Sequence, residues 1–130
     1  MDFKPSADGY SLQEPIKAYA CHDIGSVEVS LRTLSVDQLR PGPYQHRKSF
    51  PQATMYELAH SLRKAGRNAV PLIVRPAFDG PGFVIISGER RWRAAQIAGI
   101  HDLTCIVGRY TETQACFIAA AENLQRESLN

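Results

Sequence analysis

Three arginines stand within residues 90–93, directly after an apolar run that ends in Ser87 and Gly88. The apolar run predicts a strand, and the residues from Glu89 onward predict a helix. A strand that passes through a glycine into a helix presents unpaired backbone N–H groups and the positive end of the helix dipole at one place. Such a place binds anions, and arginines in the first turn add charge-assisted contacts to phosphate oxygens. The chemistry that this segment favours is therefore phosphate binding.

A second reading of the same residues stays open. Arginines on a surface helix also serve solubility, and Glu89 can satisfy the helix dipole without any ligand. Arg93 then either joins the other two arginines or pairs with Glu89. The candidate phosphate-binding residues of this segment are Ser87, Gly88, Glu89, Arg90 and Arg91.

A second polar group follows the apolar run at residues 116–121. Glu122, Asn123 and Arg126 stand at the end of an expected helix, where polar residues are ordinary. A carboxylate beside a carboxamide also supplies the hard oxygen ligands that Mg²⁺ prefers, and Mg²⁺ usually takes few protein ligands together with nucleotide phosphates. The two groups together therefore predict two halves of one triphosphate site, with Glu122 and Asn123 for Mg²⁺ and Arg126 for phosphate.

The surrounding pattern predicts an α+β domain, a small mixed sheet packed with helices. Residues 27–34 alternate apolar and polar side chains, with Val27, Val29 and Leu31 on the apolar side. Further strands are expected at 70–76, 83–88 and 103–108. A helix at 54–66 should bury Met55, Leu58, Leu62 and Ala65 and end at Gly66, and a helix opening at Thr111 should bury Phe117, Ala120, Ala121 and Leu124. Residues 1–26 look like a flexible or extended tail, and 27–130 like one domain.

Composition and charge narrow the functional classes. The net charge of +2 is unevenly spread, because residues 40–93 carry ten Lys/Arg against three acids. This local charge suits a polyanion or a nucleotide phosphate, or an ordinary solvated surface. No stretch approaches the roughly 18 apolar residues of a membrane helix, so we expect a cytoplasmic protein without a membrane partner. The three cysteines have no disulfide or zinc spacing.

Two long segments carry a resemblance to a known family. "SGERRWRAAQIAG" and "AENLQRESLN" resemble the two signature motifs of the N-terminal domain of ParB partition proteins, also called the ParB/Sulfiredoxin-like domain. The intervening segments "LRPGPYQHRKSF", "ELAHSLRKAG" and "VPLIVRP" resemble the family's Pro-rich entry, helix and strand. The resemblance covers about residues 31–130.

The resemblance implies a CTP-binding switch. CTP and Mg²⁺ would bind between the two motifs, and two nucleotide-loaded subunits would then engage as a homodimer and close a clamp around DNA. It also places Gln45 and Arg47 near the nucleotide, and a nucleoid- or plasmid-associated location. A ParA-type ATPase is a further possible partner, although the family's short basic motif is absent from the first residues.

The sequence departs from the family pattern in three places. Gln45-His46-Arg47 replaces the family's Q-P-R, and the link after residue 66 is longer and lacks its Gln, for which Asn68 or backbone groups would have to compensate. The family's helix-turn-helix is not present before the chain stops at Asn130, so we expect no sequence-specific DNA binding by this chain.

The motifs contain no obvious group to position an attacking water. We therefore expect CTP hydrolysis, if any, to be slow, at about one turnover per minute or less against a typical enzyme median of about 10 s⁻¹; no catalytic residue is assigned. The alternatives are a kinase or nuclease on the same fold, and a nucleotide-free dimerisation or DNA-adaptor module. Sulfiredoxin chemistry is disfavoured because the turn at residues 88–91 has no cysteine.

Overall fold

The computed structural model describes residues 26–44 and 50–128, with side chains as far as Glu122. Its elements in chain order are β1 (Val29–Ser35), the 3₁₀ turn η1 (Val36–Gln38), β2 (Leu39–Pro41), α1 (Gln52–Ala65), β3 (Leu72–Pro76), β4 (Phe83–Ser87), α2 (Glu89–Ala98), β5 (Asp102–Gly108) and α3 (Glu112–Ser128). The expected α+β class is confirmed. The predicted tail lies almost wholly outside the described residues.

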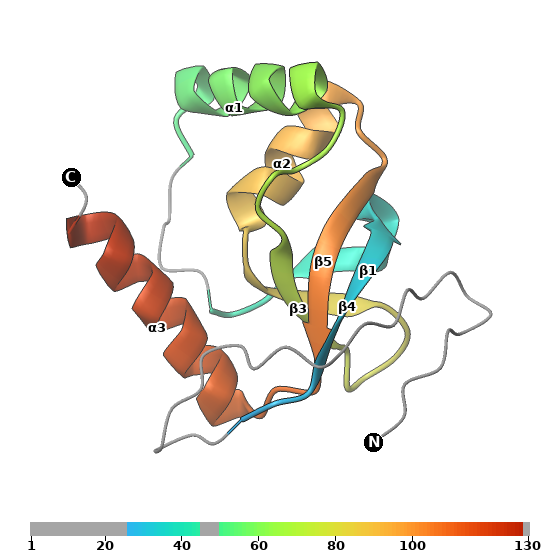
Figure 1. The fold of residues 1–130 in the computed structure, drawn as a ribbon, viewed down its shortest axis with the longest axis vertical. Helices are drawn as coiled ribbons and strands as arrows, with labels where there is room; N and C mark the ends of the chain where they lie inside the picture. Colours follow the sequence, from blue (N-terminus) through green and yellow to red (C-terminus); the bar gives the residue numbers. More distant parts are fainter. Residues whose placement is uncertain (1–25, 45–49, 129–130) are drawn as a thin grey trace.

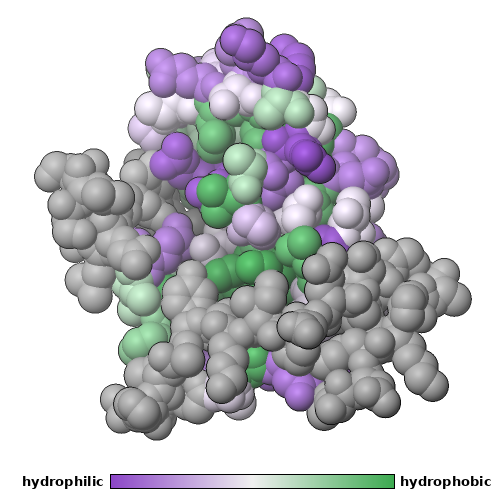
Figure 2. All heavy atoms as spheres, in the orientation of Figure 1, coloured by the Kyte–Doolittle hydropathy of each residue, from purple (hydrophilic) through white to green (hydrophobic). Residues whose placement is uncertain are grey.

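The strands form one mixed sheet in the order β1-β5-β3-β4-β2. The pairs β1–β5 and β3–β4 are antiparallel, whereas β3–β5 and β2–β4 are parallel. The helices α1 and α2 pack together at one end of the molecule, and α3 lies apart from them (Figure 1). The side of α1 that faces away from α2, at the top of the view, is largely hydrophilic (Figure 2).

Both faces of the central strands are buried. Leu72 and Val74 of β3 belong to the core under α1 and α2, whereas Ile73 between them belongs to a second core under α3. In β4, Ile85 faces the first core in the same way. These strands read as continuous apolar runs because each face is covered.

Three expectations about buried faces are wrong. In β1, Ser30 is buried and Leu31 is only half-buried, because this strand contributes to both cores. In α1, Ala59 is buried and Ala65 is exposed. Among the described side chains of α3 the buried apolar residues are Ala115, Ile118 and Ala119, whereas Phe117 and Ala120 are exposed and Ala121 is half-buried. The side chain of Leu124 lies beyond the last described one.

The element ends follow local chemistry. Gly66 adopts a left-handed conformation and its N–H bonds to the Leu62 carbonyl, as expected for a glycine C-cap. The expected capping box also forms, since Thr111 N donates to Gln114 Oε1 and Gln114 N donates to Thr111 Oγ1. The short strand β2 was missed, because a segment ending in Pro-Gly-Pro reads as a turn.

Candidate phosphate-binding site

The turn between β4 and α2 has the conformation that its glycine permits. Gly88 has a φ of 106°, and a Cβ placed there would lie 2.8 Å from Leu72 Cγ. Gly88 stands at the N-cap and makes no side-chain cap hydrogen bond. The first backbone N–H groups of α2, at the end of β4, therefore receive no side-chain cap from this residue, as in a phosphate-binding turn.

The two motifs meet at this turn. Ser87, the last residue of β4, donates a hydrogen bond from its hydroxyl to Glu122 Oε2 at 2.5 Å, across 35 residues of sequence. Glu122 lies on α3, which packs against β4. The hydroxyl and carboxylate oxygens are hard donors of the kind that Mg²⁺ takes beside phosphate, so the donor set fits that ion.

The side chains of the first turn of α2 divide into two groups. Glu89 is 6% exposed and pairs with Arg93 at 2.9 Å, and the Arg93 guanidinium lies 4.4 Å from the Phe50 ring centroid. Of the two possibilities left open for Arg93, the structure has the pair with Glu89. Arg90 and Arg91 are half-buried, and they are the two arginines of this motif that do not join that pair.

Four of the predicted site residues cannot be placed. Gln45 and Arg47 lie outside the described residues, and the side chains of Asn123 and Arg126 lie beyond the last described side chain.

Three cations among the described residues of 40–93 form ion pairs. Arg40 pairs with Asp79, and Arg75 pairs with Glu112 at 2.7 Å. Arg93 pairs with Glu89, and because Asp79 and Glu89 already belong to the three acids of this region, only Glu112 lowers its excess of positive charge.

Sequence reasoning missed a buried cation in β3. Arg75 is 6% exposed, and its guanidinium donates from Nη1 to the Tyr110 carbonyl at 3.2 Å and from Nη2 to Glu112 Oε2. It lies 5.3 Å from the Tyr44 ring centroid and 4.5 Å from that of Phe78. The signal was an arginine inside the apolar run "LIVRP", since a buried guanidinium needs partners.

This cluster shifts two pKa values. Burial, with the Glu112 side chain adding to it, raises the pKa of Tyr44 to about 12. The hydrogen bond from Arg75 holds the pKa of Glu112 below its usual value, and the Tyr44 side chain adds to this effect.

Asn68 is the second residue whose role the sequence did not fix. Its amide donates to the Thr104 and Val70 carbonyls at 3.0 and 2.9 Å and accepts from Thr104 N at 3.0 Å. The side chain thus pairs with β5 as a strand residue would, and it fastens the long link between α1 and β3.

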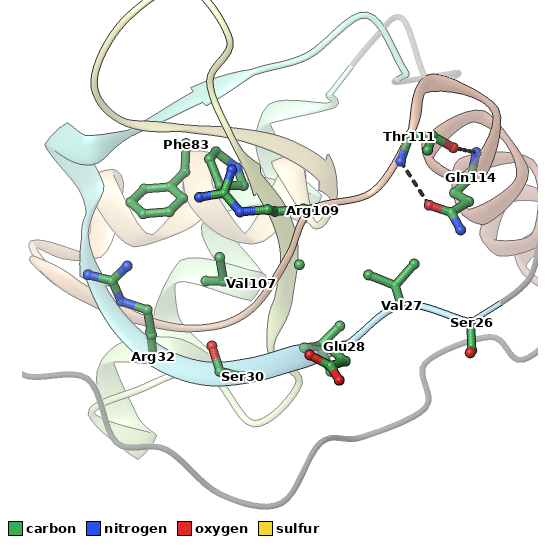
Figure 3. Close-up of a pocket in the computed structure, with 13 residues that line it drawn as sticks. Ser26, Val27, Glu28, Ser30, Arg32, Phe83, Val107, Arg109, Thr111 and Gln114 are labelled. Atoms are coloured by element: carbon green, nitrogen blue, oxygen red, sulfur yellow. Dashed lines mark hydrogen bonds between the residues drawn. The ribbon is translucent and has the colours of Figure 1, made fainter. Parts of the chain in front are cut away.

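A pocket of about 750 Å³ lies elsewhere, between β1, the end of β5 and the start of α3 (Figure 3). Arg32 lies 5.1 Å from the Phe83 ring centroid on one side of it, and the capping box of α3 lies on the other. Its lining contains none of the predicted site residues.

Within the described residues, no three His, Cys, Asp or Glu side chains gather as a metal site, and no helix is long and apolar enough to cross a membrane.

The mixed sheet with its helices, and the Gly88 turn that lies beside Glu122 of α3, define an α+β domain with a candidate phosphate site. The chain belongs to the ParB N-terminal domain family, whose model matches residues 21–124.

Individual relatives agree. The chain is 46% identical over 106 residues to a probable plasmid-partitioning protein ParB of Deinococcus radiodurans, covering 82% of this chain and 35% of that protein. It thus spans about a third of that relative's length.

Solved structures give the same fold. The truncated Caulobacter crescentus ParB complexed with CTP-gamma-S matches with a TM-score of 0.69 and 33% identity, over 74% of this chain and 53% of that one. The same protein complexed to the centromeric parS site matches with a TM-score of 0.63 and 34% identity, over 76% and 50%. Sulfiredoxin from Arabidopsis thaliana matches with a TM-score of 0.51 and 25% identity, over 77% and 97%.

Proposed function

We propose that this chain is the CTP- and Mg²⁺-binding switch domain of a ParB-like partition protein. The observation that carries the proposal is the Ser87–Glu122 contact, because it joins the two motifs at the N-terminal end of α2. The similarity to a ParB crystallised with a CTP analogue supports the choice of nucleotide.

Each group has a role in this proposal. Ser87, Gly88, Arg90 and Arg91, with Arg126, hold the triphosphate, and Glu89 keeps the turn in place through Arg93. Mg²⁺ neutralises phosphate charge and is held by Glu122 and Asn123. Gln45 and Arg47 lie near the nucleotide.

Calorimetry with the four nucleoside triphosphates and Mg²⁺ tests the site. We expect CTP to bind in preference to ATP, and Arg90→Ala or Arg91→Ala to weaken CTP binding by about 10- to 150-fold, since charge-assisted hydrogen bonds contribute about 1.5–3 kcal/mol. Arg109→Ala, on an exposed arginine outside the site, is the matched control. Equal affinity for all four nucleotides, or unchanged binding in both variants, contradicts the proposal.

The switch acts through a nucleotide-dependent homodimer that clamps DNA. Phe117 on α3 is 41% exposed beside exposed Ala120, and a second copy would cover this apolar strip. Phe117→Glu should leave CTP binding intact and abolish CTP-dependent dimerisation in sedimentation. Dimerisation that survives this change would exclude the strip as the interface.

Hydrolysis of CTP is slow and requires the dimer. Phosphate release should proceed at about one turnover per minute or less, well below the typical enzyme median, and should rise with protein concentration. A fast rate independent of concentration would indicate a dedicated hydrolase. Absence of nucleotide binding would favour the adaptor instead.

A further inference from the structure

Arg75 contacts three segments of the chain that are far apart in sequence. Its partners are Tyr44, the last described residue before Gln45, Phe78 in the loop between β3 and β4, and Glu112, the first residue of α3. Its Nη1 also holds the Tyr110 carbonyl just before α3. A single side chain thus contacts both the start of α3 and Tyr44, the residue directly before Gln45 in the sequence.

Stability alone explains this arrangement poorly. The pair joins a buried guanidinium to a carboxylate whose side chain is 63% exposed, and such a pair contributes little net stability, because solvent screens the attraction while the guanidinium is still desolvated. Here the Nε atom of Arg75 is buried and makes no hydrogen bond among the described residues, which adds to that penalty. The guanidinium instead fixes the positions of its neighbours, because its planar fork holds two acceptors in a set geometry while both its faces can stack on aromatic rings.

The start of α3 determines where Glu122 lies. Between Glu112 and Glu122 the helix rises about 15 Å, so a tilt of about 10° at its start moves Glu122 by roughly 2–3 Å. That displacement is enough to break the 2.5 Å contact with Ser87. Ala115, Ile118 and Ala119 of α3 lie in the second core, and the contacts of Arg75 hold the residues of the helix start that precede them.

We propose that Arg75 is a positioning residue for the nucleotide site, setting CTP affinity and base selectivity through α3 and Tyr44 without touching the nucleotide. This inference rests on the proposed function. Arg75 itself lies in neither of the two motifs.

Four variants test it by calorimetry with CTP and ATP, alongside thermal unfolding. Arg75→Lys retains the charge and loses the fork, and we expect about a 10-fold loss in CTP affinity and a smaller CTP-to-ATP ratio. Glu112→Ala should reproduce that loss, whereas Glu112→Gln retains an acceptor for the guanidinium and should bind like the wild type. Arg109→Lys, on an exposed arginine next to Tyr110, is the matched control and should change nothing.

The outcomes separate the two proposals. If the wild type binds no CTP, the proposed function fails and this inference fails with it. If the wild type binds CTP while Arg75→Lys and Glu112→Ala keep its affinity and selectivity, this inference alone is overturned. Should Arg75→Lys fail to fold, the contrast between Glu112→Ala and Glu112→Gln decides, because a purely structural role moves unfolding temperature and leaves selectivity unchanged.

Discussion

Replacing Gly88 with alanine perturbs the turn that presents the α2 amides. The residue has a left-handed φ of 106°, and the added Cβ would lie 2.8 Å from Leu72 Cγ and 3.4 Å from Leu72 Cα. Leu72 is fully buried at the centre of the core under α1 and α2, so it has little room to move. Two separate penalties therefore act at this position, one in the backbone and one in the packing.

The magnitudes of these two penalties can be estimated separately. A left-handed conformation at a residue with a Cβ costs about 1–2 kcal/mol, and overpacking a dense core costs about 1–3 kcal/mol. We expect a loss of roughly 2–5 kcal/mol in the free energy of unfolding, which for a chain of this size lowers Tm by about 10–20 °C. Gly99→Ala isolates the backbone part, because Gly99 has a φ of 75° and no atom lies within 4 Å of the position that its Cβ would occupy.

Thermal and urea unfolding of both variants, followed by circular dichroism, measures the difference. A Gly88→Ala/Leu72→Ala double variant should be more stable than the sum of its single changes by about 1–3 kcal/mol, since removing the Leu72 side chain relieves the contact. Equal losses in Gly88→Ala and Gly99→Ala, or strict additivity in the double variant, would refute the reasoning from close packing.

Three further predictions concern other parts of the fold. The pKa of Glu112 lies below its ordinary value of 4.5 in the folded state, so its pairing with Arg75 stabilises the fold above that pH, and this stabilisation is lost as the pH falls through the folded-state pKa. The difference in free energy of unfolding between wild type and Glu112→Gln, measured in urea from pH 7 to 3, should therefore shrink at the acid end. A difference that stays constant with pH contradicts this. Burial raises the pKa of Cys105 to about 12. In a variant with the other two cysteines replaced by serine, Cys105 of the native protein should react with a thiol reagent at least about a thousandfold more slowly than Cys105 of the unfolded protein. Comparable rates would place Cys105 outside the core. Asn68→Ala removes three hydrogen bonds and should destabilise by about 2–4 kcal/mol in urea unfolding, and a loss below about 0.5 kcal/mol would show that water replaces the amide.

Local patterns predicted most elements of the fold. The glycine after the apolar run at residues 83–87, the C-cap at Gly66 and the capping box at Thr111 each depend on neighbours within four residues, and all three are present. Asn68 and Arg75 could not be assigned partners, because those partners lie 36 and 37 residues away. The Ser87–Glu122 contact lies between these cases, since the sequence paired the two motifs without indicating which atoms would meet.

The face of α3 shows why periodicity was insufficient. Residues 115, 118, 119 and 122 and residues 117, 120, 121 and 124 both follow helical spacing, and the second set is the more apolar because it contains Phe117 and Leu124. Hydropathy therefore favoured the second set for the core, whereas the sheet receives Ala115, Ile118 and Ala119. With that face inward, Glu122 meets Ser87 and Phe117 stays exposed. The face of α3 that meets the sheet is thus the one that brings Glu122 to Ser87 and leaves Phe117 exposed.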